Sequence, residues 1–183
     1  MVFMSDRMPV KEFFHCTGEY MRTYLYKVVP VVLALIMLTG SWSIAAVAMP
    51  EFSLPSAVDG KMVSSREFRG KVLLVTFFAT WCPPCMQEVP TLIQLQKEMG
   101  PRGFTVLGLS VDEGGSGIVA KLVERRRINY PVLMANSLVA GAFGGISGIP
   151  TSFLVNKKGH VVKRYPGYVP HKILLRDIQA LLK

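Results

Sequence analysis

Two cysteines separated by two prolines follow an unbroken apolar run, and this arrangement constrains the fold more than any other feature of the 183-residue chain. Residues 72–78, Val-Leu-Leu-Val-Thr-Phe-Phe, predict a strand that is buried on both faces of a sheet. Residues 81–85, Trp-Cys-Pro-Pro-Cys, predict the start of a helix, because proline is favoured in its first turn. A strand that delivers two thiols to a helix start suits thiol–disulfide exchange, since such a pair interconverts between dithiol and disulfide.

The first 48 residues predict an export segment that precedes the folded domain. Residues 28–38 are almost wholly apolar and follow two basic side chains, Arg22 and Lys27. The run Ala-Val-Ala ending at Ala48 has the small-x-small form of a signal peptidase site, so we expect cleavage after Ala48. The sequence therefore predicts an export segment over 1–48 and a domain over 49–183.

A retained membrane anchor is the alternative to cleavage. Residues 28–49 are long enough to cross a bilayer uncut, since about 20 apolar residues suffice. A chain that starts at Met21 would have a signal of ordinary proportions, so Met21 is the expected true start. In both cases the domain is expected outside the cytoplasm, in the periplasm or on the outer face of the cytoplasmic membrane, secreted or attached through residues 28–49.

Cysteine and charge counts limit the partners of this domain. Cys16 lies in the export segment, ahead of its apolar run, so the exported part keeps Cys82 and Cys85 and has no disulfide framework. An oxidising compartment would close this pair, so a reducing role requires an electron donor, expected to be a thiol protein of the membrane. The whole chain carries a formal net charge of +9, and the part from residue 49 onward carries +8. This charge favours anionic membrane surfaces or acidic partners, and no nucleic-acid partner is expected.

The pattern after residue 49 alternates between strands and helices. The order β-β-β-α-β-α-β-β-α predicts an α/β fold, with a central mixed sheet flanked by helices and an extra N-terminal β-hairpin. The expected strands are 52–54, 62–63, 72–78, 104–110, 151–155 and 160–165, and the expected helices are 84–99, 118–127 and 171–182.

Three pieces of sequence together resemble the thioredoxin superfamily, and within it the extracytoplasmic ResA/TlpA-like branch. They are residues 77–85 (Phe-Phe-Ala-Thr-Trp-Cys-Pro-Pro-Cys), Pro90, and residues 148–151 (Gly-Ile-Pro-Thr). The resemblance covers residues 50–183. It implies a thioredoxin-like fold and a thiol–disulfide oxidoreductase without cofactor or metal, with disulfides of exported proteins such as apocytochromes c as plausible substrates.

Cys82 is the expected nucleophile, because the N-terminus of a helix favours a thiolate over a thiol. Cys85, one turn further and more buried, is the expected resolving thiol, and the two form the redox disulfide. Pro83 and Pro84 remove two N–H donors that would have stabilised the thiolate. We therefore expect the pKa of Cys82 to be less depressed than in strongly oxidising relatives, which favours a reducing role. Trp81, Pro83 and Pro84 flank the pair and are expected to contact the substrate.

Glu88 follows Cys85 by three residues, so helical geometry places it near the active-site face. Periodicity alone leaves a plain surface glutamate open. In ResA/TlpA-like proteins the glutamate of CxxCxxE is associated with the active site, which implies a role in proton transfer. Ordinary thioredoxins have a buried aspartate where this chain has Thr76, so Glu88 is the nearest carboxylate expected to deprotonate Cys85.

Pro150 is the third expected element of the site. The resemblance implies a cis peptide bond before Pro150 that faces the cysteines, with the backbone of Ile149 offered to an extended substrate peptide. An ordinary trans proline in a turn is the alternative.

Other readings of the cysteine pair stay open. A zinc site would need His160 and His171 as further ligands, and a purely structural disulfide would close a very small loop. A thiol peroxidase of the peroxiredoxin type would carry Thr or Ser where this chain has Ala79. A copper-binding cytochrome oxidase assembly protein would carry CxxxC.

Overall fold

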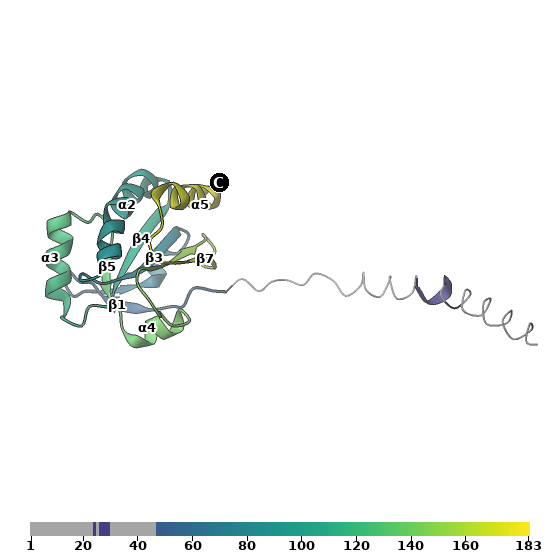
Figure 1. Ribbon diagram of the computed structural model, residues 1–183, viewed down its shortest axis with the longest axis horizontal. Coiled ribbons are helices and arrows are strands. Elements are labelled where there is room, and N and C mark those ends of the chain that lie inside the picture. Colours follow the sequence, from purple (N-terminus) through teal and green to yellow (C-terminus); the bar gives the residue numbers. More distant parts are fainter. Residues whose placement is uncertain (1–23, 25, 30–46) are drawn as a thin grey trace, which may run out of the picture. The chain divides into compact units, whose positions relative to one another are not determined.

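The computed structural model describes residues 24, 26–29 and 47–183 (Figure 1). The chain divides into two units, Met1–Ala45, in which residues 26–29 are helical, and Ala46–Lys183. Most of the expected export segment, with Cys16 and Met21, lies outside the described residues. Among the described residues no helix combines the length and the apolar character that crossing a membrane requires.

A five-stranded mixed sheet forms the centre of the second unit, with the order β5-β4-β3-β6-β7. Strand β3 runs parallel to β4 and antiparallel to β6. Every residue of β3 and β4 is buried, which explains why most of their side chains are apolar. The strands are β3 (Val72–Phe78), β4 (Phe104–Ser110), β5 (Val132–Met134), β6 (Thr151–Val155) and β7 (Val161–Pro166).

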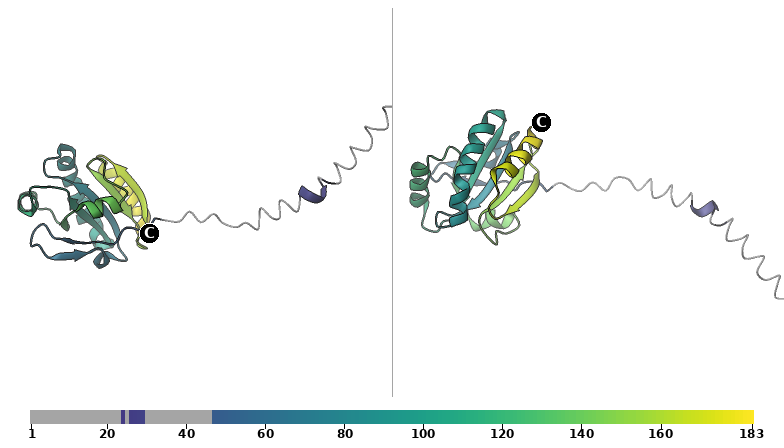
Figure 2. Two further views of the ribbon diagram at one scale, coloured as in Figure 1. Left: turned by 90° about the horizontal axis from the view of Figure 1, so that it is seen from below. Right: turned by 45° about the horizontal axis from the view of Figure 1, so that its top comes forward.

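Helices cover both faces of this sheet. Two successive parallel connections, β3 to β4 and β4 to β5, are right-handed by preference, which places α2 and α3 on the same face. Figure 1 shows α2 and α5 on one side of the sheet and α4 on the other, and Figure 2 shows the same layers from two further directions. The helices are α2 (Pro83–Met99), α3 (Ser116–Arg126), α4 (Ser137–Ala142) and α5 (His171–Leu182), with short 3₁₀ turns η1 (Ser65–Phe68) and η2 (Gly100–Arg102).

The core consists of two clusters, one on each face of the sheet. Because side chains alternate along a strand, Val72 and Leu74 of β3 pack with α2 and α5, whereas Val75 and Phe77 pack with the other face. On that second face, Phe77 meets Phe143 edge to face, with ring centroids 5.3 Å apart. The alternation also directs Thr76 toward the face that α2 covers.

The predicted N-terminal hairpin is present. Strands β1 (Ser53–Pro55) and β2 (Met62–Ser64) pair antiparallel in a separate two-stranded sheet. Ser64 caps η1 by a capping box with Glu67, which ends the hairpin and leads the chain into β3. The hairpin and η1 contribute Leu54 and Phe68 to the core cluster on the α4 face.

The predicted element order was incomplete, because it lacked β5 and α4. These elements have three and six residues, and periodicity cannot identify elements so short. The remaining predicted strands and helices are present with bounds that differ by at most two residues. Helix α2 begins one residue earlier than expected, at Pro83, and continues through Pro90 to Met99.

Candidate active site

Cys82 and Cys85 form a disulfide at the start of α2, with their Cα atoms 5.3 Å apart. Cys82 is the N-cap residue of the helix, in extended backbone conformation, and Cys85 lies in its first turn. Both residues are almost fully buried, at 3% and 2% exposure. The carboxyl end of β3 and the first turn of α2 thus hold the two sulfurs next to each other, as the sequence predicted.

The first turn of α2 offers few donors to the sulfur of Cys82. Pro83 and Pro84 have no N–H, so the first amide available inside the helix is that of Cys85, which donates to Cys82 Sγ at 3.3 Å. A helix start without prolines would present two further N–H groups there. The sulfur of Cys82 is therefore supported by one amide and by the helix dipole.

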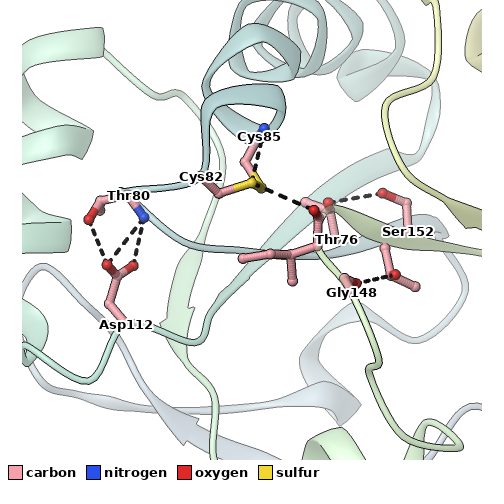
Figure 3. The surroundings of a disulfide bond; sticks show 9 residues. Thr76, Thr80, Cys82, Cys85, Asp112, Gly148 and Ser152 are labelled. Atoms are coloured by element: carbon pink, nitrogen blue, oxygen red, sulfur yellow. Dashed lines mark hydrogen bonds between the residues drawn. A yellow bond between two sulfur atoms is a disulfide. The ribbon is translucent and has the colours of Figure 1, made fainter.

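The loop before β6 reaches Cys82 from the opposite side. The carbonyl oxygen of Ile149 lies 3.7 Å from Cys82 Sγ, close enough to accept a hydrogen bond from the thiol of the reduced form. The Ile149–Pro150 peptide bond is cis, as the resemblance implied. The hydroxyl of Thr151 donates to the carbonyl of Gly148 at 2.7 Å and closes this loop (Figure 3).

Several apolar side chains near the two cysteines are exposed. Trp81 is 69% exposed, and Pro83 and Pro84 are also on the surface. Tyr168, which the sequence analysis did not identify, is 46% exposed. Its neighbour Gly167 donates its N–H to the carbonyl of Pro150 at 2.7 Å, so Tyr168 follows a residue bonded to the cis-proline loop.

Glu88 is buried within α2, with 1% of its surface exposed, which rules out the alternative of a plain surface glutamate. One hydrogen bond reaches it, from the N–H of Val169 to Oε1 at 3.2 Å. Burial raises the pKa of Glu88 to about 7, and the Val169 N–H counteracts part of this rise. Burial also raises the pKa of Tyr130, and the charge of Glu88 adds to it, so the two side chains share one environment.

The position that carries an aspartate in thioredoxins is occupied by Thr76, which is buried. Ser152 of β6 donates its hydroxyl to Thr76 Oγ1 at 2.9 Å (Figure 3). The hydroxyls of Ser152 and Thr76 thus bond to each other across β6 and β3, and neither is a base that could deprotonate Cys85. Glu88 is therefore the carboxylate that α2 itself brings to the side of the cysteines.

Asp112 supports the turn that leads from β3 to Trp81, and the sequence analysis missed it. Its carboxylate accepts the N–H of Thr80 at 2.9 Å, the hydroxyl of Thr80 at 2.6 Å and the hydroxyl of Ser110 at 2.8 Å (Figure 3). The sequence did contain a signal for Asp112. It comes just after β4, and parallel neighbouring strands such as β3 and β4 end at the same edge of a sheet, where Cys82 also follows β3. Asp112 therefore fixes the backbone two residues before Cys82.

The two histidines of the zinc alternative lie on separate elements, His160 between β6 and β7 and His171 at the start of α5. Within residues 47–183 and the short described helical stretch, no three side chains of His, Cys, Asp or Glu lie together as a metal site would require.

The fold and the buried cysteine pair define a class, the thioredoxin superfamily. The family model described as Redoxin matches residues 45–182, so the chain belongs to the Redoxin family. The match spans the whole second unit from its start to the end of α5.

Similar proteins of known name indicate the branch of the superfamily to which the chain belongs. The chain is 27% identical over 126 residues to the thiol-disulfide oxidoreductase ResA of Halalkalibacterium halodurans, covering 69% of this chain and 70% of the relative. It is 29% identical over 135 residues to ResA of Bacillus subtilis, covering 73% of each chain. The crystal structure of a thiol:disulfide interchange protein of the thioredoxin family from Chlorobium tepidum matches with a TM-score of 0.71 and 38% identity, over 77% of this chain and 99% of that one. The chain is thus a thiol–disulfide oxidoreductase of the ResA/TlpA-like branch.

Proposed function

We propose that the protein is exported and reduces disulfides in proteins outside the cytoplasm. Cys82 acts as the nucleophile, Cys85 as the resolving thiol and Glu88 as the proton acceptor. The observation that carries the proposal is the position of Cys82, at the N-cap of α2 with Ile149 3.7 Å away. This position gives the sulfur a helix dipole on one side and a backbone carbonyl of the cis-proline loop on the other.

The reaction is an exchange of sulfur–sulfur bonds in two steps. The thiolate of Cys82 attacks one sulfur of the substrate disulfide, and the second substrate sulfur leaves as a thiolate that takes up a proton. Glu88 then accepts the proton of Cys85, whose sulfur attacks Cys82 and releases the first substrate sulfur. The substrate gains two electrons, and the protein ends in the Cys82–Cys85 disulfide seen in the structure.

Glu88 suits the proton step because its pKa of about 7 lies near the operating pH. At that pH a fraction of the carboxyl groups is ionised and can accept a proton from Cys85. The residue lies one helical turn after Cys85, on the same side of α2.

The surface around the sulfurs supports a protein substrate. Trp81, Pro83 and Pro84 are exposed next to the buried disulfide in the sequence, and Tyr168 is exposed next to Gly167, which bonds to the cis-proline loop. We call these four side chains the apolar rim. An extended peptide would lie across this rim and pair with the backbone of Ile149, as in recognition by strand addition. Apocytochromes c, whose CxxCH cysteines must be reduced before haem attachment, are the proposed substrates, and a thiol protein of the membrane is the proposed electron donor.

The proposed direction of electron flow rests on the prolines. Because Pro83 and Pro84 leave one amide near Cys82 Sγ, we expect the thiolate to be weakly stabilised and the dithiol to be a good reductant. The absorbance of the thiolate, followed against pH, measures this directly. Ionisation of Cys82 well below about pH 5 would contradict a reducing role.

A Cys85→Ser variant tests the mechanism in the cell that makes the protein. Without the resolving thiol, Cys82 should stall as a mixed disulfide with its substrate, which mass spectrometry of the trapped complex identifies. The matched control is Cys82→Ser with Cys85 intact, which should trap nothing. If the Cys85→Ser protein accumulates no more partner than this control, the exchange mechanism is wrong.

A further inference from the structure

A pocket of about 350 Å³ lies at the amino end of β3. Its charged lining consists of five cations and one carboxylate, a net charge of +4. They are Arg66, Arg69, Lys71, Lys157, Lys158 and Glu51. We call these six residues with the pocket the basic pole.

The lone carboxylate of the basic pole is already engaged. Arg66 contacts Glu51 at 2.6 Å and Arg69 contacts it at 2.6 Å, so two arginines share one negative charge. These contacts lower the pKa of Glu51, which therefore stays ionised and holds the arginines in place. The positive excess of the pole lies with the exposed lysines Lys71, Lys157 and Lys158.

The chain enters the domain at this pole. Ala48 and Met49 line the pocket. Met49 donates its N–H to the carbonyl of Gly159 at 2.8 Å, and Val161 donates its N–H to the carbonyl of Val47 at 2.8 Å. In the sequence, the apolar stretch that begins at Val28 ends here, directly before the basic pole.

The redox site lies at the other end of the same strand. Lys71 immediately precedes β3, whereas Cys82 follows its carboxyl end. Seven residues of strand separate the two ends by about 20 Å. A surface bound through the basic pole would therefore leave Trp81 and the cysteines directed away from it.

We propose that the basic pole docks onto the anionic phosphate headgroups of a membrane surface. Exposed lysines suit a fluid layer of headgroups, because each carries a point charge on a flexible stem. Lys71 and Lys158 are exposed, and Lys157, also exposed, donates from Nζ to the carbonyl of Leu182 at 3.2 Å. In the anchored, uncleaved form of the protein, the apolar segment joins the domain at this pole, which argues for a membrane as the occupant. This inference rests on the proposed location outside the cytoplasm, and it adds an orientation in which the disulfide faces soluble partners.

Vesicle binding tests the proposal on the fragment 46–183. This fragment is the complete second unit and contains every residue of both core clusters. The probes are vesicles of phosphatidylglycerol with phosphatidylcholine, and vesicles of phosphatidylcholine alone. The fragment should sediment with the anionic vesicles and dissociate as salt screens the charges. Replacing Lys71, Lys157 and Lys158 together by Gln should weaken this binding about 100-fold, from about fivefold per lysine.

A charge-matched variant distinguishes the pole from the overall positive charge. Lys121, Arg125 and Arg126 are exposed on α3, on the face of the sheet that α2 covers, and their replacement by Gln should leave vesicle binding nearly unchanged. Equal losses in the two triple variants would overturn the proposal, as would equal binding to both kinds of vesicle. If inorganic phosphate released the fragment from the anionic vesicles more than chloride does at the same ionic strength, the pole would be assigned to a soluble anion instead. Reduction of a model disulfide by the same samples reports the redox function separately.

Discussion

Two buried carboxylates lie on either side of the cysteine pair, and their surroundings differ. Asp112 accepts hydrogen bonds from Ser110 and from both the N–H and the hydroxyl of Thr80. Glu88 accepts one, from the N–H of Val169, is 1% exposed, and adds its charge to the environment of the buried Tyr130. The same chemical group is thus a structural anchor in one place and an incompletely solvated acid in the other.

This difference assigns the two carboxylates different tasks. A carboxylate whose oxygens accept several hydrogen bonds fixes the groups that donate to it. A carboxylate with few donors in an apolar setting takes up and releases a proton near neutral pH. Asp112 therefore positions the turn before Cys82, whereas Glu88 is the proposed acceptor of the proton of Cys85. Four measurements test this division, in order of decreasing effect.

Glu88→Gln should give the largest effect. The variant keeps the size of the side chain but cannot accept the proton of Cys85, so resolution of the mixed disulfide should slow at least about 100-fold near neutral pH. Rapid mixing of the reduced protein with a disulfide peptide measures this step. The step in the wild type should speed up as pH rises through about 7, where Glu88 ionises, and the variant should lack this dependence. An unchanged pH–rate profile would remove Glu88 from the mechanism.

The same substitution should change how stability depends on pH. The pKa of Glu88 is about 7 in the folded protein and near 4.5 in the unfolded chain, so the folded state binds the extra proton between these values. Relative to Glu88→Gln, the wild type should therefore keep its full stability below about pH 4.5 and lose on the order of 3 kcal/mol as pH rises from there through about 7. Urea unfolding of the oxidised proteins at several pH values measures the loss. Parallel curves for the two proteins would mean that Glu88 is not desolvated.

Asp112→Asn should act mainly on stability. An amide nitrogen cannot accept the donors that surround this position, so we expect a loss of about 2 kcal/mol in the free energy of unfolding. The rate of exchange should fall less than in Glu88→Gln, and its dependence on pH near 7 should persist. If that dependence disappeared as it does in Glu88→Gln, the two carboxylates would share the proton step.

Thr80→Val should give the smallest effect. The substitution removes the hydroxyl that donates to Asp112 at 2.6 Å but keeps the backbone N–H bond, so the loss should be about 1 kcal/mol. Combined with Asp112→Asn, it should add less than its own separate effect, because both changes remove the same contact. Full additivity would show that the two residues do not act together.

The sequence predicted the long elements and the reactive pair well. Strands β3 and β4 and helix α5 have their predicted bounds because an unbroken apolar run and a clear helical period are local signals. The position of Cys82 at a helix start followed from the neighbouring prolines. These features depend on residues that are close together in the chain.

The same local signals could not identify Asp112 or Tyr168 as parts of the site. Asp112 meets Thr80, 32 positions away, because β3 and β4 run parallel and end at the same edge. Tyr168 adjoins the site because Gly167 bonds to the loop of Pro150. Both contacts require the strand order of the sheet, which no short segment contains.

By itself, the sequence determined the chemistry of this protein. It provides two thiols at a helix start, two prolines that limit the donors to the nucleophile and a glutamate one turn further along α2. The tertiary structure decided how that chemistry is tuned, because only packing could bury Glu88 beneath Val169 and raise its pKa to about 7. Helical periodicity places a side chain on a face of its helix, but the free energy of its charge depends on what covers that face.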